Sequence, residues 1–371
     1  MPHLTLETGR RSITGHPLND LSARLGLANL PYGLAKIRYV QEQLGIEPDA
    51  RFEATPDFSV TRNRSRWKAG FAYGGILRWA GDLVILDLKP NACGMLVGAY
   101  DCDTIYDVSN RIKQGLPEAL ELSHGVARWD FDFSNHFFQI YRCRDSRVTG
   151  LNRYDCVFVL HGSGKEFRHR LYYDHPDFTF ARQVQVRETP WGPLRCLTGQ
   201  AAVDYQAGFM EVEAFSKERR EAFAKTAFGE FRVVANTTHQ GLVEPGKMLL
   251  GAVDANQGEP VPFTLREELP AFLLTSERGR VALPHGGGYV LTREGDSVHV
   301  NGEHDDHRVV TVGSGADREI VEDIRSEPFG YRGGETLEKA LTVPHVVVAA
   351  ELHPVWRIQR KGLRVISPAQ T

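Results

Sequence analysis

One cysteine and three histidines have the residue types of a metal site. Cys93, His136, His161 and His239 each lie beside an apolar run, where the end of a strand would present the side chain to a partly dry site. A thiolate with imidazoles suits Zn, Mn, Fe or Co, and a bridging thiolate can hold two ions. The four residues lie far apart in the sequence, so no short metal-binding motif contains them. A small buried thiol and hydrogen-bonded core or capping histidines are the structural alternatives.

A histidine followed by three glycines is a second candidate for chemistry. His285 precedes Gly286, Gly287 and Gly288, whose backbone N–H groups could surround an anion. Beside a bound phosphate, such a histidine could act as a nucleophile toward phosphorus or as a general acid. A flexible glycine loop without a ligand is the alternative interpretation.

The densest basic cluster lies between residues 61 and 68 and includes a tryptophan. It is interpreted either as a segment that contacts phosphate or as a solvated loop. The 371 residues include 44 basic and 47 acidic ones, and the net charge of −3 excludes the general basic field of a non-specific nucleic-acid binder. A polyanion site must therefore be local, and its candidates are Arg62, Arg64, Arg66 and Lys68.

Nothing in the sequence predicts export or membrane insertion. The first residues lack the apolar core of a signal peptide, and no apolar run approaches the roughly 20 residues that span a bilayer. Five cysteines at irregular spacings do not indicate a disulfide framework. We therefore expect a cytoplasmic protein, in which a reduced cysteine can serve as a metal ligand.

Hydrophobic periodicity predicts three helices, over residues 31–44, 106–122 with an interruption near 115–117, and 203–228. In the last of these, apolar residues mark one face and the charged run 217–221 marks the other. The polar, mixed composition of the first 30 residues predicts a strand or two and a poorly ordered start.

Apolar segments over residues 82–88, 131–142, 155–160 and 231–239 predict buried strands that would deliver the candidate ligands. A tight turn after the first of them would present Cys93. The last third alternates short strands with Gly- and Pro-rich turns. These patterns predict an α+β fold with mixed sheets, in one intertwined domain where residues 1–60 pack on a core of residues 61–371.

The order of the short motifs resembles the RtcB-type RNA ligases, which join RNA 3′-phosphate and 5′-hydroxyl ends. That family has, in order, a Cys-Gly turn, Asn-His-Phe, a His followed by Ser-Gly, His-Asn, His-Gly-Ala-Gly-Arg and Lys-Gly. The similar motifs here are Asn91-Ala92-Cys93-Gly94-Met95, Asn135-His136-Phe137, His161-Gly162-Ser163-Gly164, Thr238-His239-Gln240, His285-Gly286-Gly287-Gly288 and Arg360-Lys361-Gly362. The resemblance covers roughly residues 60 to 362, motif by motif.

The resemblance implies a central dinuclear manganese site in an RtcB-like catalytic domain. Cys93 would bridge two Mn²⁺ ions, with His136 on one and with His161 and His239 on the other. Zn²⁺ or another divalent ion is an alternative. The family's further metal-binding Asp is replaced by Pro90, so that one ion would depend on Asp87 or Asn91 or be absent.

The resemblance also implies that His285 attacks the α-phosphorus of GTP. The guanylyl group would pass to an RNA 3′-phosphate, which can derive from a 2′,3′-cyclic phosphate, and a 5′-hydroxyl would then displace GMP. The resemblance further implies that Asn135 contacts phosphate and takes part in catalysis, and that Gly286 and Gly287 bind the nucleotide. Tyr331 would contact the face of the guanine base, and Lys361 would contact its edge. The basic residues between Arg62 and Lys68 would hold RNA ends.

The sequence departs from the family's pattern mainly around the nucleotide. Tyr289 stands in place of an Arg, Gln139 in place of a Glu, and Glu267 and Glu268 lie where the family has Pro-Gly-Ser-Met-Gly. Three functions follow as hypotheses. The first is an RtcB-like RNA ligase, the second is a metal-dependent phosphohydrolase or RNA end-processing enzyme of the same fold, and the third is a non-catalytic RNA- or metal-binding relative.

Overall fold

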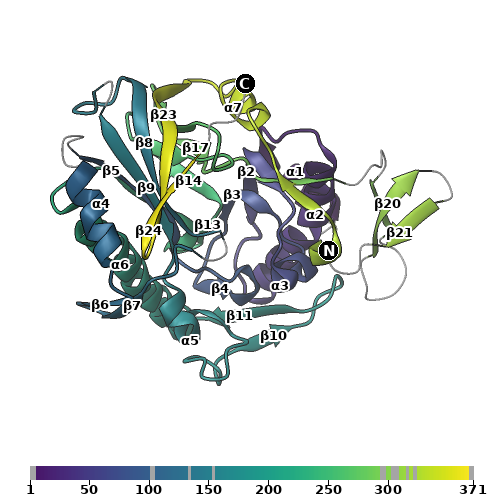
Figure 1. Cartoon of the computed structure of the whole chain (residues 1–371). Helices are drawn as coiled ribbons and strands as arrows, with labels where there is room; N and C mark the ends of the chain where they lie inside the picture. The colour runs from purple at the N-terminus through teal and green to yellow at the C-terminus, as the bar shows by residue number, and fades with distance from the viewer. Residues whose placement is uncertain are drawn as a thin grey trace.

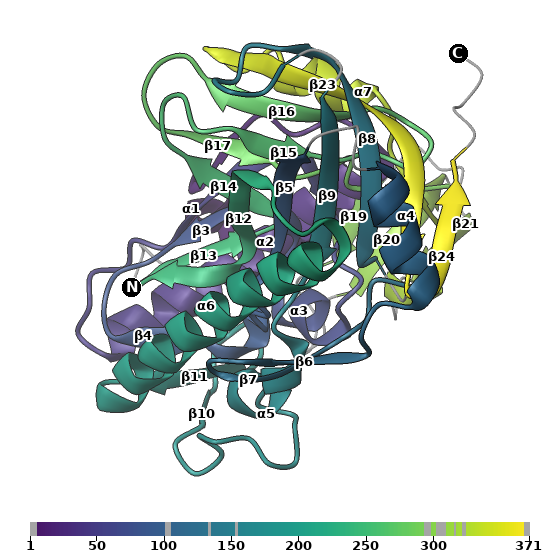
Figure 2. The same cartoon turned by 60° about the vertical axis from the view of Figure 1, so that its left-hand side comes forward.

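The computed structural model describes residues 6–100, 105–132, 135–152, 155–292, 298–301, 309–314, 317–320 and 324–366. A curled twelve-stranded sheet is its main element (Figures 1 and 2). From one edge to the other, its strands are β1 (Ile13–Gly15), β2 (Arg51–Ser59), β3 (Tyr73–Arg78), β13 (Lys247–Leu250), β12 (Arg232–Glu244), β5 (Cys93–Tyr100), β9 (Cys156–Gly162), β8 (Phe137–Ser146), β23 (Val346–Gln359), β16 (Ala271–Ser276) and β15 (Val261–Phe263), with β24 (Gly362–Val365) beside β23.

The pairing in this sheet is antiparallel except between β1 and β2, which are parallel. The sheet is therefore mixed, and the whole is a mixed α/β fold. Because β1 and β2 belong to the same sheet as the later strands, residues 13–59 are part of the main architecture.

Smaller sheets surround the main one. They are β10 (Gln185–Arg187), β11 (Leu194–Thr198) and β4 (Leu83–Ile85); β14 (Ala252–Ala255) and β17 (Val281–Pro284); β18 (Tyr289–Leu291) and β22 (Phe329–Tyr331); β6 (Ala119–Leu122) and β7 (Gly125–Arg128); and β19 (Val298–Asn301), β20 (Val309–Ser314) and β21 (Asp317–Ile320). In Figure 1, β20 and β21 extend away from the rest of the molecule.

The helices are α1 (Leu6–Arg11), α2 (Leu21–Gln43), α3 (Arg64–Ala69), α4 (Ile105–Gln114), α5 (Arg168–Leu171), α6 (Gln200–Phe228) and α7 (Glu335–Ala340). The 3₁₀ turns are η1 (Leu86–Leu88), η3 (Lys165–Phe167) and η4 (Ile324–Ser326). Among the residues that the structure describes, no helix is both long enough and apolar enough to span a membrane.

Helix α6 confirms the longest predicted helix and packs across β12, β5 and β9 (Figure 2). Its predicted apolar face is buried, with Phe209, Phe215 and Phe223 fully inaccessible. The prediction for the charged run was wrong at two positions, because Arg219 and Arg220 are also fully buried. Both guanidinium groups pack beneath the sheet at the ligand strands.

Several predicted boundaries were wrong. The helix predicted over 106–122 ends at Gln114, after which residues 119–122 form β6. The strand predicted over 82–88 is β4 followed by the 3₁₀ turn η1, and the strand predicted from residue 131 begins at Phe137. Residues 64–69 of the basic cluster form α3 rather than a loop, because Asn63 caps the helix by accepting a hydrogen bond from the Arg66 backbone N–H.

Helix α2 begins ten residues earlier than the position predicted from Pro31, at Leu21. Asp20 caps its N-terminus, since its side chain accepts a 2.8 Å hydrogen bond from the Ala23 backbone N–H. Pro31 lies inside the helix rather than at its first turn. The same carboxylate also accepts 2.6 Å and 2.8 Å hydrogen bonds from Arg332, whose side chain is completely buried.

We predict that Asp20→Ala destabilises the protein by about 3 kcal/mol or more, because it removes a helix cap and leaves a buried guanidinium without its counter-charge. Asp20→Asn should cost less, since the amide keeps the capping oxygen. The free energy of unfolding in urea, followed by circular dichroism, measures both.

Glu42→Ala, at an exposed position of the same helix, is the matched control and should change the unfolding free energy by no more than about 0.5 kcal/mol. Equal effects of Asp20→Ala and Glu42→Ala would contradict the account of the Asp20–Arg332 pair.

Candidate metal centre

Four adjacent strands bring the predicted ligands together. His239 lies in β12, Cys93 is the first residue of β5, His161 lies in β9, and His136 immediately precedes β8. These strands are consecutive neighbours in the sheet, although β12 follows β9 by 69 residues in the sequence. All four side chains are buried.

The Cys93 thiol lies near two histidines, and the third lies next to one of these. Its Sγ is 2.9 Å from Nε2 of His161 and 4.0 Å from Nε2 of His136. The Nε2 atoms of His161 and His239 are 3.3 Å apart. The ligand atoms of Cys93, His161 and His239 all lie within 4.8 Å of one another, a grouping compatible with one bound metal ion.

Local backbone irregularities aim two of these ligands. Before Cys93, Lys89 and Ala92 have φ angles of +46° and +54°, which non-glycine residues rarely adopt. The predicted tight turn before Cys93 is therefore present, and the Cys93 N–H closes it by donating to Asn91 Oδ1. His239 was predicted at a turn after a strand, but it lies within β12 where the register shifts, and such a bulge can re-aim a side chain.

Hydrogen bonds at Nδ1 orient two of the imidazoles. His161 Nδ1 is 2.8 Å from the backbone oxygen of Asn135, and His136 Nδ1 is 2.6 Å from Asp130 Oδ2. Both acceptors require the proton on Nδ1, which leaves each Nε2 lone pair available to a cation. This arrangement is typical of histidine ligands in metal sites, so the residues fit a divalent metal.

Burial controls the ionisation of the cluster. Desolvation lowers the pKa values of His161 and His239 well below their ordinary range, so both imidazoles are neutral near pH 7. Desolvation also raises the pKa of the Cys93 thiol to about 12, whereas the nearby Arg220 charge acts in the opposite direction. Without a metal ion, the thiol therefore keeps its proton.

Asp87 and Asn91 are the candidates to substitute for the metal-binding aspartate that the RtcB-type ligases have at the position of Pro90, and both are engaged elsewhere. Asp87 is engaged with Arg195, accepting from its backbone N at 2.9 Å and from Nη1 at 3.3 Å. Asn91 uses its side-chain oxygen for the Cys93 N–H. Neither residue therefore has a side-chain oxygen directed at the cluster in this arrangement.

Arginines of α6 provide positive charge beneath the cluster. Arg220 donates to Asn236 Oδ1 and to Ser216 Oγ, both at 2.9 Å, and its Nη2 is buried without a hydrogen-bond partner. A Cβ added at Gly94, next to Cys93, would lie 2.9 Å from that Nη2. The charge of this guanidinium acts to lower the pKa of the Cys93 thiol and so favours its thiolate form.

The Asp130 carboxylate links the positively charged Arg219 of α6 to His136. It accepts hydrogen bonds from Arg219 Nη2, from His136 Nδ1 and, at 2.9 Å, from Lys165 Nζ. Burial alone would raise the pKa of Asp130, but the hydrogen bond from His136 and the charge of Arg219 outweigh it and hold that pKa below its ordinary value. The group is therefore a carboxylate at neutral pH.

His285 lies directly beside the cluster. Its ring centroid is 4.3 Å from that of His239, and its Nδ1 is 2.8 Å from Oδ2 of the fully buried Asp57 and 2.7 Å from the backbone oxygen of Gly251. Both neighbours are hydrogen-bond acceptors, so Nδ1 carries the proton and Nε2 has a lone pair. This is the arrangement of a histidine nucleophile or general base.

The glycine loop after His285 is packed rather than open. Added Cβ atoms would lie 2.8 Å from the Thr264 oxygen at Gly286, 2.7 Å from the Arg332 oxygen at Gly287 and 2.3 Å from the Asp57 oxygen at Gly288. The prediction that the glycine N–H groups all remain free for an anion was wrong for Gly287, whose N–H donates to the Thr264 oxygen.

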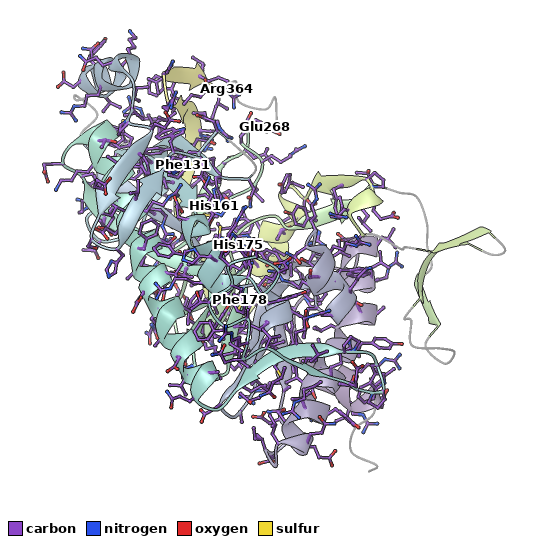
Figure 3. All side chains as sticks on the ribbon, turned by 90° about the horizontal axis from the view of Figure 1, so that it is seen from below. Phe131, His161, His175, Phe178, Glu268 and Arg364 are labelled. Carbon is purple, nitrogen blue, oxygen red and sulfur yellow. The ribbon has the colours of Figure 1, made fainter. Side chains whose placement is uncertain are left out.

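A cavity of about 670 Å³ adjoins His161 and His285. Five cationic and two anionic side chains line it, so it has a positive excess that suits an anionic ligand. Figure 3 shows His161 near the middle of the molecule, with Glu268 and Arg364 toward one edge. Of the predicted site residues, those lining the cavity are Arg62, Arg66, Asn135, His161, His285, Gly286, Gly287 and Tyr331.

Other predicted residues lie elsewhere. Lys361 is exposed in the turn between β23 and β24 and does not line the cavity. Arg64 and Lys68 are exposed on α3, also outside the lining. Arg66 is buried, because its guanidinium donates to the backbone oxygens of Leu88 and Lys89. It can contribute positive potential to the cavity but not a flexible surface contact.

The cavity rim contains an ion-pair network that the sequence did not predict. Glu267 pairs with Arg357 at 3.0 Å and with Arg364 at 2.7 Å, and Arg357 also donates to the His136 backbone oxygen at 3.2 Å. Glu267 therefore does not present an unpaired negative charge to a ligand. Gln139 supports the same loop by donating to the Glu267 backbone oxygen.

Two acidic residues of the site, Asp57 and Asp130, were also missed. Asp57 lies in β2, where polar residues alternate with apolar ones, so nothing in that pattern marks it as a buried acid. Asp130 also has no local signal, because its partners His136, Lys165 and Arg219 come from three separate segments.

We predict that Co²⁺ binding, measured by the near-ultraviolet thiolate-to-cobalt absorption, strengthens as pH rises. The thiol is protonated well below about pH 12 and must lose its proton to bind, whereas the two buried histidines are already neutral. The logarithm of the affinity should therefore rise by about one per pH unit between about pH 7 and about pH 9. Cys93→Ser should abolish the absorption band, and an affinity independent of pH would contradict thiolate ligation.

No known protein-family model matches this chain, and no curated protein matches it significantly. The resemblance to the RtcB-type RNA ligases therefore stays a prediction based on the order of the short motifs.

Proposed function

We propose that this protein is a metal-dependent nucleotidyl transferase of the RtcB-like RNA ligase type, acting in the cytoplasm. His285 would be guanylylated by GTP, and the guanylyl group would activate an RNA 3′-phosphate for joining to a 5′-hydroxyl end. The observation that carries this proposal is the position of His285, whose Nδ1 is held by Asp57 while its ring lies against that of His239 in the Cys/His cluster.

The hydrogen bond at Nδ1 supports a nucleophilic role for His285. With the proton on Nδ1, the Nε2 lone pair can attack the α-phosphorus of GTP, forming an N–P bond as the bond to pyrophosphate breaks. Asp57 stabilises the positive charge that develops on the imidazole ring. An RNA 3′-phosphate oxygen then displaces His285, and a 5′-hydroxyl finally displaces GMP.

The Cys/His cluster supports the same chemistry. Cys93, His161 and His239 would hold one divalent ion, and Cys93 with His136 would contribute to a second. Such ions supply positive charge to the non-bridging phosphate oxygens during phosphoryl transfer. We take Mn²⁺ as the ion by resemblance, with Zn²⁺ as the alternative.

The cavity provides groups that suit a nucleotide. Tyr289 and Tyr331 lie at its lining with ring centroids 5.3 Å apart, and Tyr331 is about half exposed, so that a base could stack on it. Arg66 is a buried cation whose partners are backbone oxygens and the Thr61 hydroxyl. Its charge is therefore available to attract phosphate.

A phosphohydrolase or end-processing enzyme is the second candidate. Glu267 pairs with Arg357 and Arg364, two cations that would otherwise be available to nucleotide phosphates at the rim. In this alternative, His285 would activate water against a phosphate ester rather than take up a guanylyl group.

We predict that the wild-type protein, incubated with Mn²⁺ and α-³²P-GTP, acquires covalent label that survives alkali and is lost in acid, as a phosphoramidate should. His285→Ala should acquire none. His353→Ala, at a partly exposed position outside the cavity lining, is the matched control and should be labelled like the wild type. Absence of label in the wild type, together with phosphate release from 3′-phosphorylated RNA, would favour the phosphohydrolase instead.

We further predict that Asp57→Asn slows labelling of His285 by about 100-fold or more. An amide can donate to Nδ1 and so favour the wrong tautomer, an effect that reaches about four orders of magnitude in serine proteases. The labelling rate at saturating GTP measures this. Labelling within about twofold of wild type would exclude Asp57 from positioning the nucleophile.

A further inference from the structure

The two histidines next to the Cys93 thiol are held by chemically different groups. His161 donates from Nδ1 to a neutral backbone oxygen, that of Asn135. His136 donates to the Asp130 carboxylate. His161 is fixed within β9, between β5 and β8, whereas His136 precedes the first residue of β8.

The Asp130 carboxylate is itself firmly oriented. Arg219, which has no exposed surface, donates to Oδ1 and packs its guanidinium 4.9 Å from the centre of the Phe131 ring. A second bond from its Nε to Glu166 Oε1, at 3.1 Å, fixes the guanidinium further. Oδ2 remains for His136 and for Lys165. The carboxylate therefore imposes both a ring orientation and a tautomer on His136.

We propose that Asp130 is the positioning residue that directs His136 Nε2 toward Cys93, and that it thereby determines whether a second divalent ion binds on the His136 side. This inference rests on the metal centre of the proposed function. The first ion, held by Cys93, His161 and His239, does not require Asp130. Metal binding is therefore sequential, and only the second ion depends on the Asp130 network.

The isosteric change Asp130→Asn tests this role. With its oxygen retained by Arg219, the new amide directs its N–H₂ group at His136 Nδ1 and forces that atom to become an acceptor. The proton then moves to Nε2, where it blocks metal binding. Loss of a carboxylate behind a histidine ligand typically weakens metal binding by about 10- to 100-fold.

The measurement is a titration of the full-length chain with Co²⁺, followed by calorimetry for stoichiometry and by the thiolate-to-cobalt absorption. The wild type should bind two ions. Asp130→Asn should keep the first ion and its thiolate absorption but weaken the binding of the second ion by about 10-fold or more. A merely structural defect would weaken the binding of both ions together.

Asp254→Asn is a matched control. Asp254 is a buried carboxylate that also pairs with three cations, namely Arg78, Lys247 and Arg280, but has no histidine partner. The Asp254→Asn substitution should lower the stability of the protein without changing the affinity for either ion. If Asp130→Asn fails to fold, His136→Ala serves in its place and should likewise remove only the second ion.

The results separate the inference from the proposed function. A wild type that binds a single ion, or an Asp130→Asn or His136→Ala variant that binds two ions with wild-type affinities, would overturn the inference alone. A wild type that binds no Co²⁺, or that loses none in Cys93→Ser, would overturn the metal centre itself. Two ions in the wild type without covalent GTP labelling would leave the inference standing and contradict the ligase proposal.

Discussion

The antiparallel pairing of β12, β5, β9 and β8 is the constraint on which the candidate site depends. These four neighbours bring His239, Cys93, His161 and His136 close together, although the residues come from segments that are far apart in sequence. In the register of the sheet, Met95 and Phe137 both pair with His161. A slip of one strand by one residue would turn all of its side chains to the opposite face and disperse the cluster.

Burial determines the protonation states of the candidate ligands and also makes it costly to introduce charge at the site. Away from water, the imidazoles of His161 and His239 are neutral and the Cys93 thiol is protonated, so a cation can bind only with loss of the thiol proton. The buried guanidinium groups of Arg219 and Arg220 offset this cost, one through Asp130 and the other near Cys93. A buried charge without such partners would be strongly destabilising, which explains why α6 brings two arginines into the interior.

Local patterns in the sequence were sufficient for the type of several elements and for naming the cysteine and three histidines as candidates. The apolar spacing of α6 and the apolar runs of β9 and β12 are strong signals, because each element buries one face or lies inside the sheet. The buried positions of Arg219 and Arg220 could not be predicted this way, since their partners lie in other segments. The start of α2 was missed because Pro31 resembles a helix start, whereas the cap is Asp20.

The same limit applies to the functional site. Cys93, His136, His161 and His239 were candidates from residue type, but their separation was set by strand order, which no local pattern contains. The pairing of Glu267 with Arg357 and Arg364 likewise depends on contact between a loop and a distant hairpin. Lys361 was placed by resemblance alone, and its exposed turn lies outside the cavity lining.

The most direct test of the central claim is anomalous diffraction from crystals of the wild-type protein grown with Mn²⁺. The account predicts an anomalous peak within bonding distance of Cys93 Sγ and the Nε2 atoms of His161 and His239. A well-ordered Cys93 cluster with no peak, in crystals that show Mn²⁺ elsewhere, would contradict the account.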